Sequence, residues 1–134
     1  MPNNLKEIVM TEISISIDVL DMNKAVLFYT KALGCTELRA GEDTTKLNTD
    51  NVNIFLLKKE SGSNPLINGT SSRNYERHWT PVHLDFNVTE IENVASLVKE
   101  FGGVVEGSES GDWGAVEFCA DPFGNGFCLC QINN

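Results

Sequence analysis

Apolar and polar residues alternate along two stretches of the chain, residues 13–19 and residues 82–88. A period of two is typical of a β-strand that turns one face towards a core. Each stretch is followed by apolar residues at helical spacing, within residues 22–33 and residues 91–98. Spacings of three, four and seven residues place these side chains on one stripe of a helix. The pattern therefore predicts a strand followed by an amphipathic helix at two places in the chain.

Both predicted helices carry start and stop signals. Asp21 can accept backbone N–H bonds at the start of the first helix, and residues 89–92 fit a capping box before the second. Gly34 and Gly102 follow the last apolar positions, where glycine commonly ends a helix. We therefore expect both helices to begin and end near these residues.

The two strand–helix units match each other when the first is shifted by 69 residues, the interval from Ser14 to His83. The shift superposes Val19 on Val88, Met22 on Ile91, Ala25 on Val94, Val26 on Ala95, Tyr29 on Val98 and Gly34 on Gly103. An internal repeat of this kind indicates that one structural unit occurs twice.

Strand-like segments follow each helix, at residues 35–40, 44–49 and 52–58, and again at 104–107, 115–120 and 126–132. Residues 121–126, which join the last two, are rich in Asp, Pro, Gly and Asn and predict a tight hairpin. The sequence thus predicts an α+β fold. Two βαβββ modules form an eight-stranded, incompletely closed barrel with the helices outside.

We expect one domain over residues 1–134, with repeats at about 12–59 and 81–132 joined by a linker at 60–80. The linker is rich in Ser, Gly, Asn and Pro. An exposed connection is the first interpretation of such a composition, and a loop lying over a pocket is the alternative.

The face of each first strand that points away from the helix is polar, with Ser14, Ser16, Asp18, His83, Asp85 and Asn87 at equivalent positions. The last strands add Phe55, Leu57, Cys128 and Cys130 to this face, and Trp113 can form a wall beside it. A partly apolar cup with a few convergent polar groups is the usual form of a ligand site. The alternative is a plain solvent-exposed sheet face.

The formal net charge of −9 disfavours nucleic acid and anionic membranes as partners. No apolar run approaches the roughly 20 residues that span a bilayer. Residues 1–7 lack the pattern of a signal peptide, so we expect a cytoplasmic protein whose four cysteines are reduced thiols.

Several segments resemble the vicinal oxygen chelate superfamily, which includes glyoxalase I, bleomycin resistance proteins and extradiol dioxygenases. One is the run Asp-Met-Asn-Lys-Ala-Val-Leu-Phe-Tyr at residues 21–29, followed by Leu33 and Gly34. Residues 120–127, Ala-Asp-Pro-Phe-Gly-Asn-Gly-Phe, resemble the hairpin of that family. Residues 78–86, His-Trp-Thr-Pro-Val-His-Leu-Asp-Phe, resemble an uncharacterised glyoxalase-like branch. The resemblance implies the paired-module fold, and it implies a homodimer.

The resemblance also implies four metal-ligand positions in the metal-dependent members, which histidine and glutamate usually fill. The corresponding residues here are Ser14, Phe55, His83 and Cys128. Only His83 keeps the usual type; Phe55 cannot bind a metal, and Ser14 is a poor ligand. A divalent metal on His83 and Cys128, joined by Cys130 or Asp85, is one interpretation. Small buried cysteines with a purely structural role are the other.

Three hypotheses follow. The first is a protein that binds a small molecule in the cup without the usual metal centre. The second is a metal-dependent lyase or dioxygenase of the glyoxalase type that uses His83 and Cys128. In both, His83 is the candidate catalytic or ligand-binding histidine, since imidazole can act as a general base or a hydrogen-bond donor. The third is a non-catalytic interaction module.

Overall fold

The structure is a computed structural model that describes residues 10–133 of the chain. The N-terminal segment, in which we expect no signal peptide, lies outside the described residues. Among residues 10–133, no helix has the length and apolar character needed to cross a membrane.

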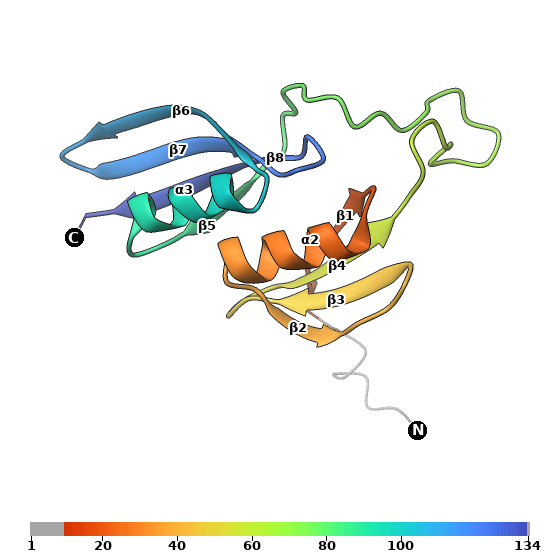
Figure 1. The fold of residues 1–134 in the computed structure, drawn as a ribbon, viewed down its shortest axis with the longest axis horizontal. Helices are drawn as coiled ribbons and strands as arrows, with labels where there is room; N and C mark the ends of the chain where they lie inside the picture. The colour runs from red at the N-terminus through yellow and green to blue at the C-terminus, as the bar shows by residue number, and fades with distance from the viewer. Residues whose placement is uncertain (1–9, 134) are drawn as a thin grey trace.

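The elements occur in the same order twice, as strand, helix and three further strands (Figure 1). The first module contains β1 (Ser14–Val19), α2 (Met22–Leu27), η1 (Phe28–Ala32), β2 (Thr36–Arg39), β3 (Thr44–Asn48) and β4 (Asn53–Lys58). The second contains β5 (Leu84–Asn87), α3 (Ile91–Glu100), β6 (Val104–Gly111), β7 (Gly114–Ala120) and β8 (Gly126–Ile132). The predicted α+β class with two βαβββ modules is confirmed.

Each module forms its own four-stranded sheet, with strand order β1-β4-β3-β2 in the first and β5-β8-β7-β6 in the second. The first and last strands of each module are parallel neighbours, and the remaining pairs are antiparallel. Within residues 10–133 no backbone ladder joins the two sheets, so β1 and β5 are both sheet edges. The strands do not close into a complete barrel, as the sequence predicted.

The strand register shows which residues of β4 and β8 are equivalent in the two modules. Phe55 of β4 lies opposite Ser16 of β1, and Cys128 of β8 lies opposite Asp85 of β5. Because Ser16 and Asp85 are related by the repeat, Phe55 and Cys128 occupy equivalent places in the two sheets. The strand register, and not only the sequence repeat, therefore places a phenylalanine in the first module where the second has a cysteine.

The helix-covered faces of the first strands are shorter than predicted. Ile13 and Val82, which are equivalent in the repeat, were expected on these faces, but they are 74% and 82% exposed. Both lie before the point where strand pairing begins, at Ser14 and Leu84. The alternating pattern correctly identifies the strands but extends past their hydrogen-bonded part.

The first helix changes its winding halfway along. After α2 the chain continues as a short π-helix, η1, which buries Phe28, Tyr29 and Ala32. Asp21 caps the start as predicted, accepting a 3.0 Å bond from the N–H of Lys24. Gly34 has a positive φ of 73°, as a helix-ending glycine requires. The π-turn was not predicted, because apolar spacing alone does not distinguish it from an α-turn.

The second helix begins without the predicted capping box. Glu90 occupies the N-cap position, and no side chain at that position bonds the helix start. Instead, the side-chain oxygen of Gln131 on β8 accepts a 2.8 Å bond from the N–H of Ile91. A long-range partner satisfies the donor that residues 89–92 were expected to satisfy locally.

The two modules share one hydrophobic core. The helix segment η1 packs against α3, and the rings of Phe28 and Phe127 lie edge to face with their centres 5.9 Å apart. A Cβ at Gly103 would come within 2.7 Å of the Phe28 ring, so glycine permits this close approach. The core fixes the helix-covered sides of the modules to each other.

Candidate functional site

Three side chains with metal-binding or proton-transfer chemistry meet on the face of the second sheet that points away from α3, where Cys128 is buried. The Nδ1 atom of His83 lies 3.2 Å from Oδ1 of Asp85 and 3.7 Å from Sγ of Cys128. One ligand atom from each of the three residues falls within 4.8 Å of the other two. His83 directly precedes β5, Asp85 lies within it, and Cys128 lies opposite on β8. We call these three residues the His83 cluster.

The environment of Cys128 favours the protonated thiol. Burial, followed by the nearby charges of Asp85 and Cys130, raises the pKa of Cys128 to about 11. Burial also raises the pKa of Cys130, its neighbour on the same face. A protonated thiol is a weak nucleophile, so Cys128 is suited to donating a hydrogen bond or to ligating a metal that displaces its proton.

The three equivalent positions of the first module, Ser14, Ser16 and Phe55, hold no such cluster. Ser14 and Ser16 are exposed, and Phe55 stands where the second module has Cys128. Phe55 is half-buried, and Nζ of Lys46 on β3 lies 5.7 Å from the centre of its ring. The alternation of β4 places Leu57 on the same side as Phe55. This face therefore offers hydroxyls, an aromatic surface and a cation.

Three further predicted residues lie outside the His83 cluster. Asn87 is exposed on β5, and its strand partner on β8 is Cys130. Trp113 lies at the turn between β6 and β7 and is 48% exposed. It is thus at the opposite end of the second sheet from the hairpin at residues 121–126. The structure does not bring Trp113 to the His83 cluster.

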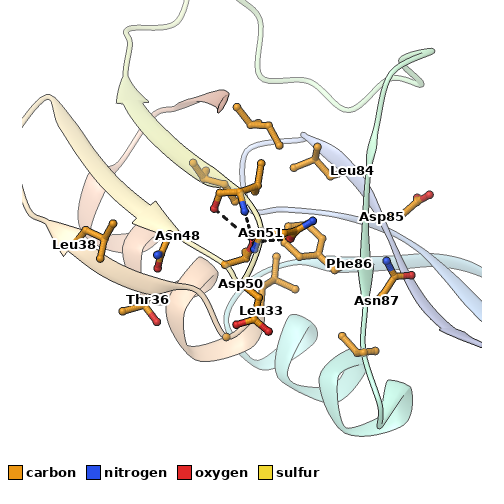
Figure 2. A pocket seen from close by; sticks show the side chains of 16 residues that line it. Leu33, Thr36, Leu38, Asn48, Asp50, Asn51, Leu84, Asp85, Phe86 and Asn87 are labelled. Atoms are coloured by element: carbon orange, nitrogen blue, oxygen red, sulfur yellow. Dashed lines mark hydrogen bonds between the residues drawn. The ribbon is translucent and has the colours of Figure 1, made fainter. Parts of the chain in front are cut away.

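The larger of two clefts between the modules has a volume of about 830 Å³. Figure 2 shows Asn51 in the turn between β3 and β4, facing Leu84 and Phe86 of β5 across this cleft. Asp85 and Asn87 contribute to its lining, but Figure 2 shows their side chains pointing to the far side of β5. The cleft is therefore bounded by the apolar side of β5 and lies behind the His83 cluster.

A second cleft, of about 380 Å³, is lined by Ser16, Asp18 and His83 together with residues of the linker and of the 121–126 hairpin. The linker is therefore not only an exposed connection, and its alternative interpretation as a pocket-lining loop holds for this cleft. Phe55, Leu57, Cys128 and Cys130 line neither cleft. Within one chain, the predicted ligand-binding residues are thus divided between two open sheet faces and two clefts.

Sequence reasoning missed two arginines in the linker. The guanidinium of Arg73 donates a 2.8 Å bond to Asp18, and that of Arg77 forms two bonds, of 2.7 and 2.9 Å, to Glu106. The hydrogen bonds from Arg77 hold the pKa of Glu106 below its usual range. Arg73 and Arg77 are four residues apart in a segment without helical periodicity, so no sequence pattern predicts their ion pairs.

Two βαβββ modules, each with the first and last strands of its sheet as parallel neighbours, form the architecture that the resemblance to the vicinal oxygen chelate superfamily implied. Residues 14–130 match the family model described as a glyoxalase-like domain. The chain belongs to this glyoxalase-like family. No curated protein matches the chain at a significant level.

The fold is similar to that of several solved structures. One is the fosfomycin resistance protein FosX from Listeria monocytogenes in complex with Mn(II) and sulfate, with 16% identity, a TM-score of 0.70, and coverage of 94% of this chain and 93% of that chain. FosX from Mesorhizobium loti is 12% identical with a TM-score of 0.70, over 94% and 95% of the two chains. TnmS3, an antibiotic binding protein from Streptomyces sp. CB03234, is 20% identical with a TM-score of 0.65, over 94% and 99%. At these identities the likeness concerns the fold alone.

Proposed function

We propose that the protein binds a small organic molecule on its open sheet faces, without the usual metal centre of metal-dependent relatives. The main support for this proposal is the difference between the equivalent sheet faces of the two modules. The first module has Ser14 and Phe55 where a metal site would need ligands, while Phe55 and Leu57 retain a half-buried apolar surface. An apolar surface with a few polar groups suits organic ligands. The antibiotic-binding TnmS3 supports the same use of this fold.

A homodimer is part of this proposal. The open face of each module has no cover from the other module within residues 10–133, because the shared core holds the modules together through their helix-covered sides. We propose that a second copy of the chain covers these faces, so that each cup is completed across the dimer. Light scattering coupled to size-exclusion chromatography is expected to give twice the chain mass of 14.8 kDa.

The ligand itself can be sought by thermal shift with a library of antibiotics and other small organic molecules, with and without EDTA. We expect at least one compound to raise the melting temperature equally in both conditions. Phe55→Ala should weaken that shift, whereas Leu27→Ala, which removes an apolar side chain on the helix surface, should leave it unchanged. A ligand response that EDTA abolishes and added metal restores would contradict metal-free binding.

The His83 cluster supports a second candidate function, that of a metal-dependent lyase or dioxygenase. An imidazole, a carboxylate and a thiol make a three-ligand set that leaves room for substrate on the metal. The thiol of Cys128 makes this set better suited to Zn²⁺ than to Mn²⁺, which prefers oxygen ligands. A bound ion would polarise a substrate oxygen or activate a water molecule. The chain would contribute His83, Asp85 and Cys128 as its holders.

The two histidines of the chain provide a matched test of this second candidate. We expect His83→Ala to abolish zinc binding measured by isothermal titration calorimetry, and His78→Ala to retain it. A protein that stays metal-free in excess zinc, nickel, manganese and ferrous iron would exclude the metal-dependent function and leave the first proposal standing. Four free thiols suit a reducing compartment, so we propose a cytoplasmic location for either function.

A further inference from the structure

The linker contains a segment, residues 73–80, that contacts both modules and that we call the strap. In Figure 1 the chain leaves β4, loops away from the sheets and returns past the β7–β8 hairpin to enter β5. The strap is the returning part, and from Arg73 to His78 its side chains alternate in burial. Arg73, Tyr75 and Arg77 are half-buried, whereas Asn74, Glu76 and His78 are exposed.

The odd-numbered side chains of the strap anchor it to both modules. Arg73 pairs with Asp18 of the first module, and Arg77 pairs with Glu106 of the second. Between them, the hydroxyl of Tyr75 donates a 2.7 Å bond to the carbonyl of Lys59. These contacts fix the strap at three successive odd positions, so its even-numbered side chains have a defined direction.

Two glycines of the hairpin allow the strap to lie directly on the backbone. A Cβ at Gly124 would come within 2.7 Å of the carbonyl oxygen of Tyr75. A Cβ at Gly126 would come within 2.8 Å of the guanidinium of Arg77. The Gly-x-Gly sequence of the hairpin thus fits the strap as well as the turn, and the strap is a packed part of the fold.

The even-numbered side chains line the 380 Å³ cleft beside β1 and the hairpin. They are Asn74, Glu76, His78 and Thr80, and Val82, just beyond the strap, also lines the cleft. The other side of the cleft is apolar, with Ile15, Ile17 and Leu84 among its residues. A cleft of this size, with an apolar floor and a rim of hydrogen-bonding groups, has the form of a small-molecule site.

The charges in this cleft select the kind of ligand. The acidic residues that line it are Asp18 and Glu76, and among the described residues no lysine or arginine does. Asp18 is already paired with Arg73, which leaves the Glu76 carboxylate to interact with a ligand. The net charge of −9 adds a field that attracts cations.

We propose that the cleft under the strap binds a small organic cation, with its ammonium group paired to Glu76 and its apolar body against Ile17 and Leu84. This site goes beyond the proposed function, because it lies between the modules and not on the open sheet faces. His83 lines the cleft as well as belonging to the His83 cluster, so the two sites are neighbours.

Three probes of similar size and different charge test the proposal: phenethylammonium, 2-phenylethanol and phenylacetate. Two-dimensional NMR titration of the full chain should show phenethylammonium binding most tightly and phenylacetate least. Glu76→Gln should weaken phenethylammonium binding by about threefold or more, as expected for a partly solvated ion pair, and should leave 2-phenylethanol unchanged. Glu92→Gln, an exposed change on α3, is the matched control and should alter neither.

A charge reversal keeps the test decisive if the effect of neutralisation is small. Glu76→Lys should reverse the order of phenethylammonium and phenylacetate. Equal binding of the charged and neutral probes to the wild-type protein, or an order that Glu76→Lys leaves unchanged, would overturn the proposal. A library compound that loses affinity in Phe55→Ala but not in Glu76→Gln would support binding on the sheet faces whatever the outcome for the cleft.

Discussion

The hydroxyl of Tyr29 in the first module donates a 2.6 Å hydrogen bond to Oδ2 of Asp121 in the second, and both side chains are buried. Asp121 also accepts bonds from the backbone N–H groups of Phe123 and Asn125. The side chain of Asn125 bonds both Asp121 and the carbonyl of Asp18 on β1. One buried carboxylate therefore shapes the hairpin and ties it to both modules.

Removing the Tyr29 hydroxyl should test this connection. Tyr29→Phe leaves the ring in the core but takes away a bond to a buried carboxylate. We expect the free energy of unfolding in urea to fall by about 1.5–3 kcal/mol. Tyr75→Phe, which removes a hydroxyl bonded to a backbone carbonyl near the surface, is the comparison and should cost about 1 kcal/mol or less. Equal losses in the two variants would show that burial adds nothing to the Tyr29 bond.

The cap of α3 offers a second prediction, in which a distant residue matters more than a local one. Gln131→Ala removes the acceptor of the Ile91 N–H and should lower the free energy of unfolding by about 1 kcal/mol, the usual effect of losing a helix cap. Thr89→Ala should have almost no effect, because that side chain does not cap the helix. If urea denaturation showed a larger loss for Thr89→Ala than for Gln131→Ala, the capping box and not Gln131 would cap α3.

The sequence predicts the modules well because their signals are local. Alternation, the helical stripe and the Asp21 cap depend on residues close in the chain, and the repeat doubles each signal. The bond from Ile91 to Gln131 and the pairing of Arg77 with Glu106 join residues 40 and 29 positions apart. Such contacts depend on how the elements pack in three dimensions, and a short stretch of sequence contains no information about that packing.

The candidate site shows the same division. The His83 cluster could be predicted, because alternation places His83 and Asp85 on one face of the first strand of the second module. The resemblance to the superfamily then places Cys128 beside His83. The division of the other residues between faces and clefts could not. It depends on the modules packing through their helix-covered sides, so that Ser16 and His83 share a cleft while Phe55 and Cys128 do not.

The reactivity of Cys128 should report its environment through its pH dependence. Its pKa of about 11 lies above the usual value for a thiol, 9.0, so the folded state favours the proton. This contributes stability that is complete below pH 9 and is lost as the pH rises through 11. Iodoacetamide labelling of Cys128, followed by mass spectrometry, should still accelerate above pH 9 in the folded protein. In the urea-unfolded chain the rate should be half-maximal near pH 9 and level off about one pH unit higher. The same profile in the folded protein would contradict the raised pKa.

Gly124 provides a final prediction, because two requirements coincide at this residue. Its φ of 84° favours glycine, and a Cβ would meet the Tyr75 carbonyl at 2.7 Å. Gly34 is the matched control, since its φ is 73° but a Cβ there would meet nothing within 4 Å. Gly34→Ala should therefore lower the free energy of unfolding by about 1 kcal/mol, the effect of placing alanine at a positive φ.

Gly124→Ala should lower the free energy of unfolding by about 1–3 kcal/mol more than Gly34→Ala does, because the strap must move. It should also make the chain more sensitive to trypsin at Arg73 and Arg77. Similar stability and cleavage rates in the two variants would mean that the strap does not pack on the hairpin as described.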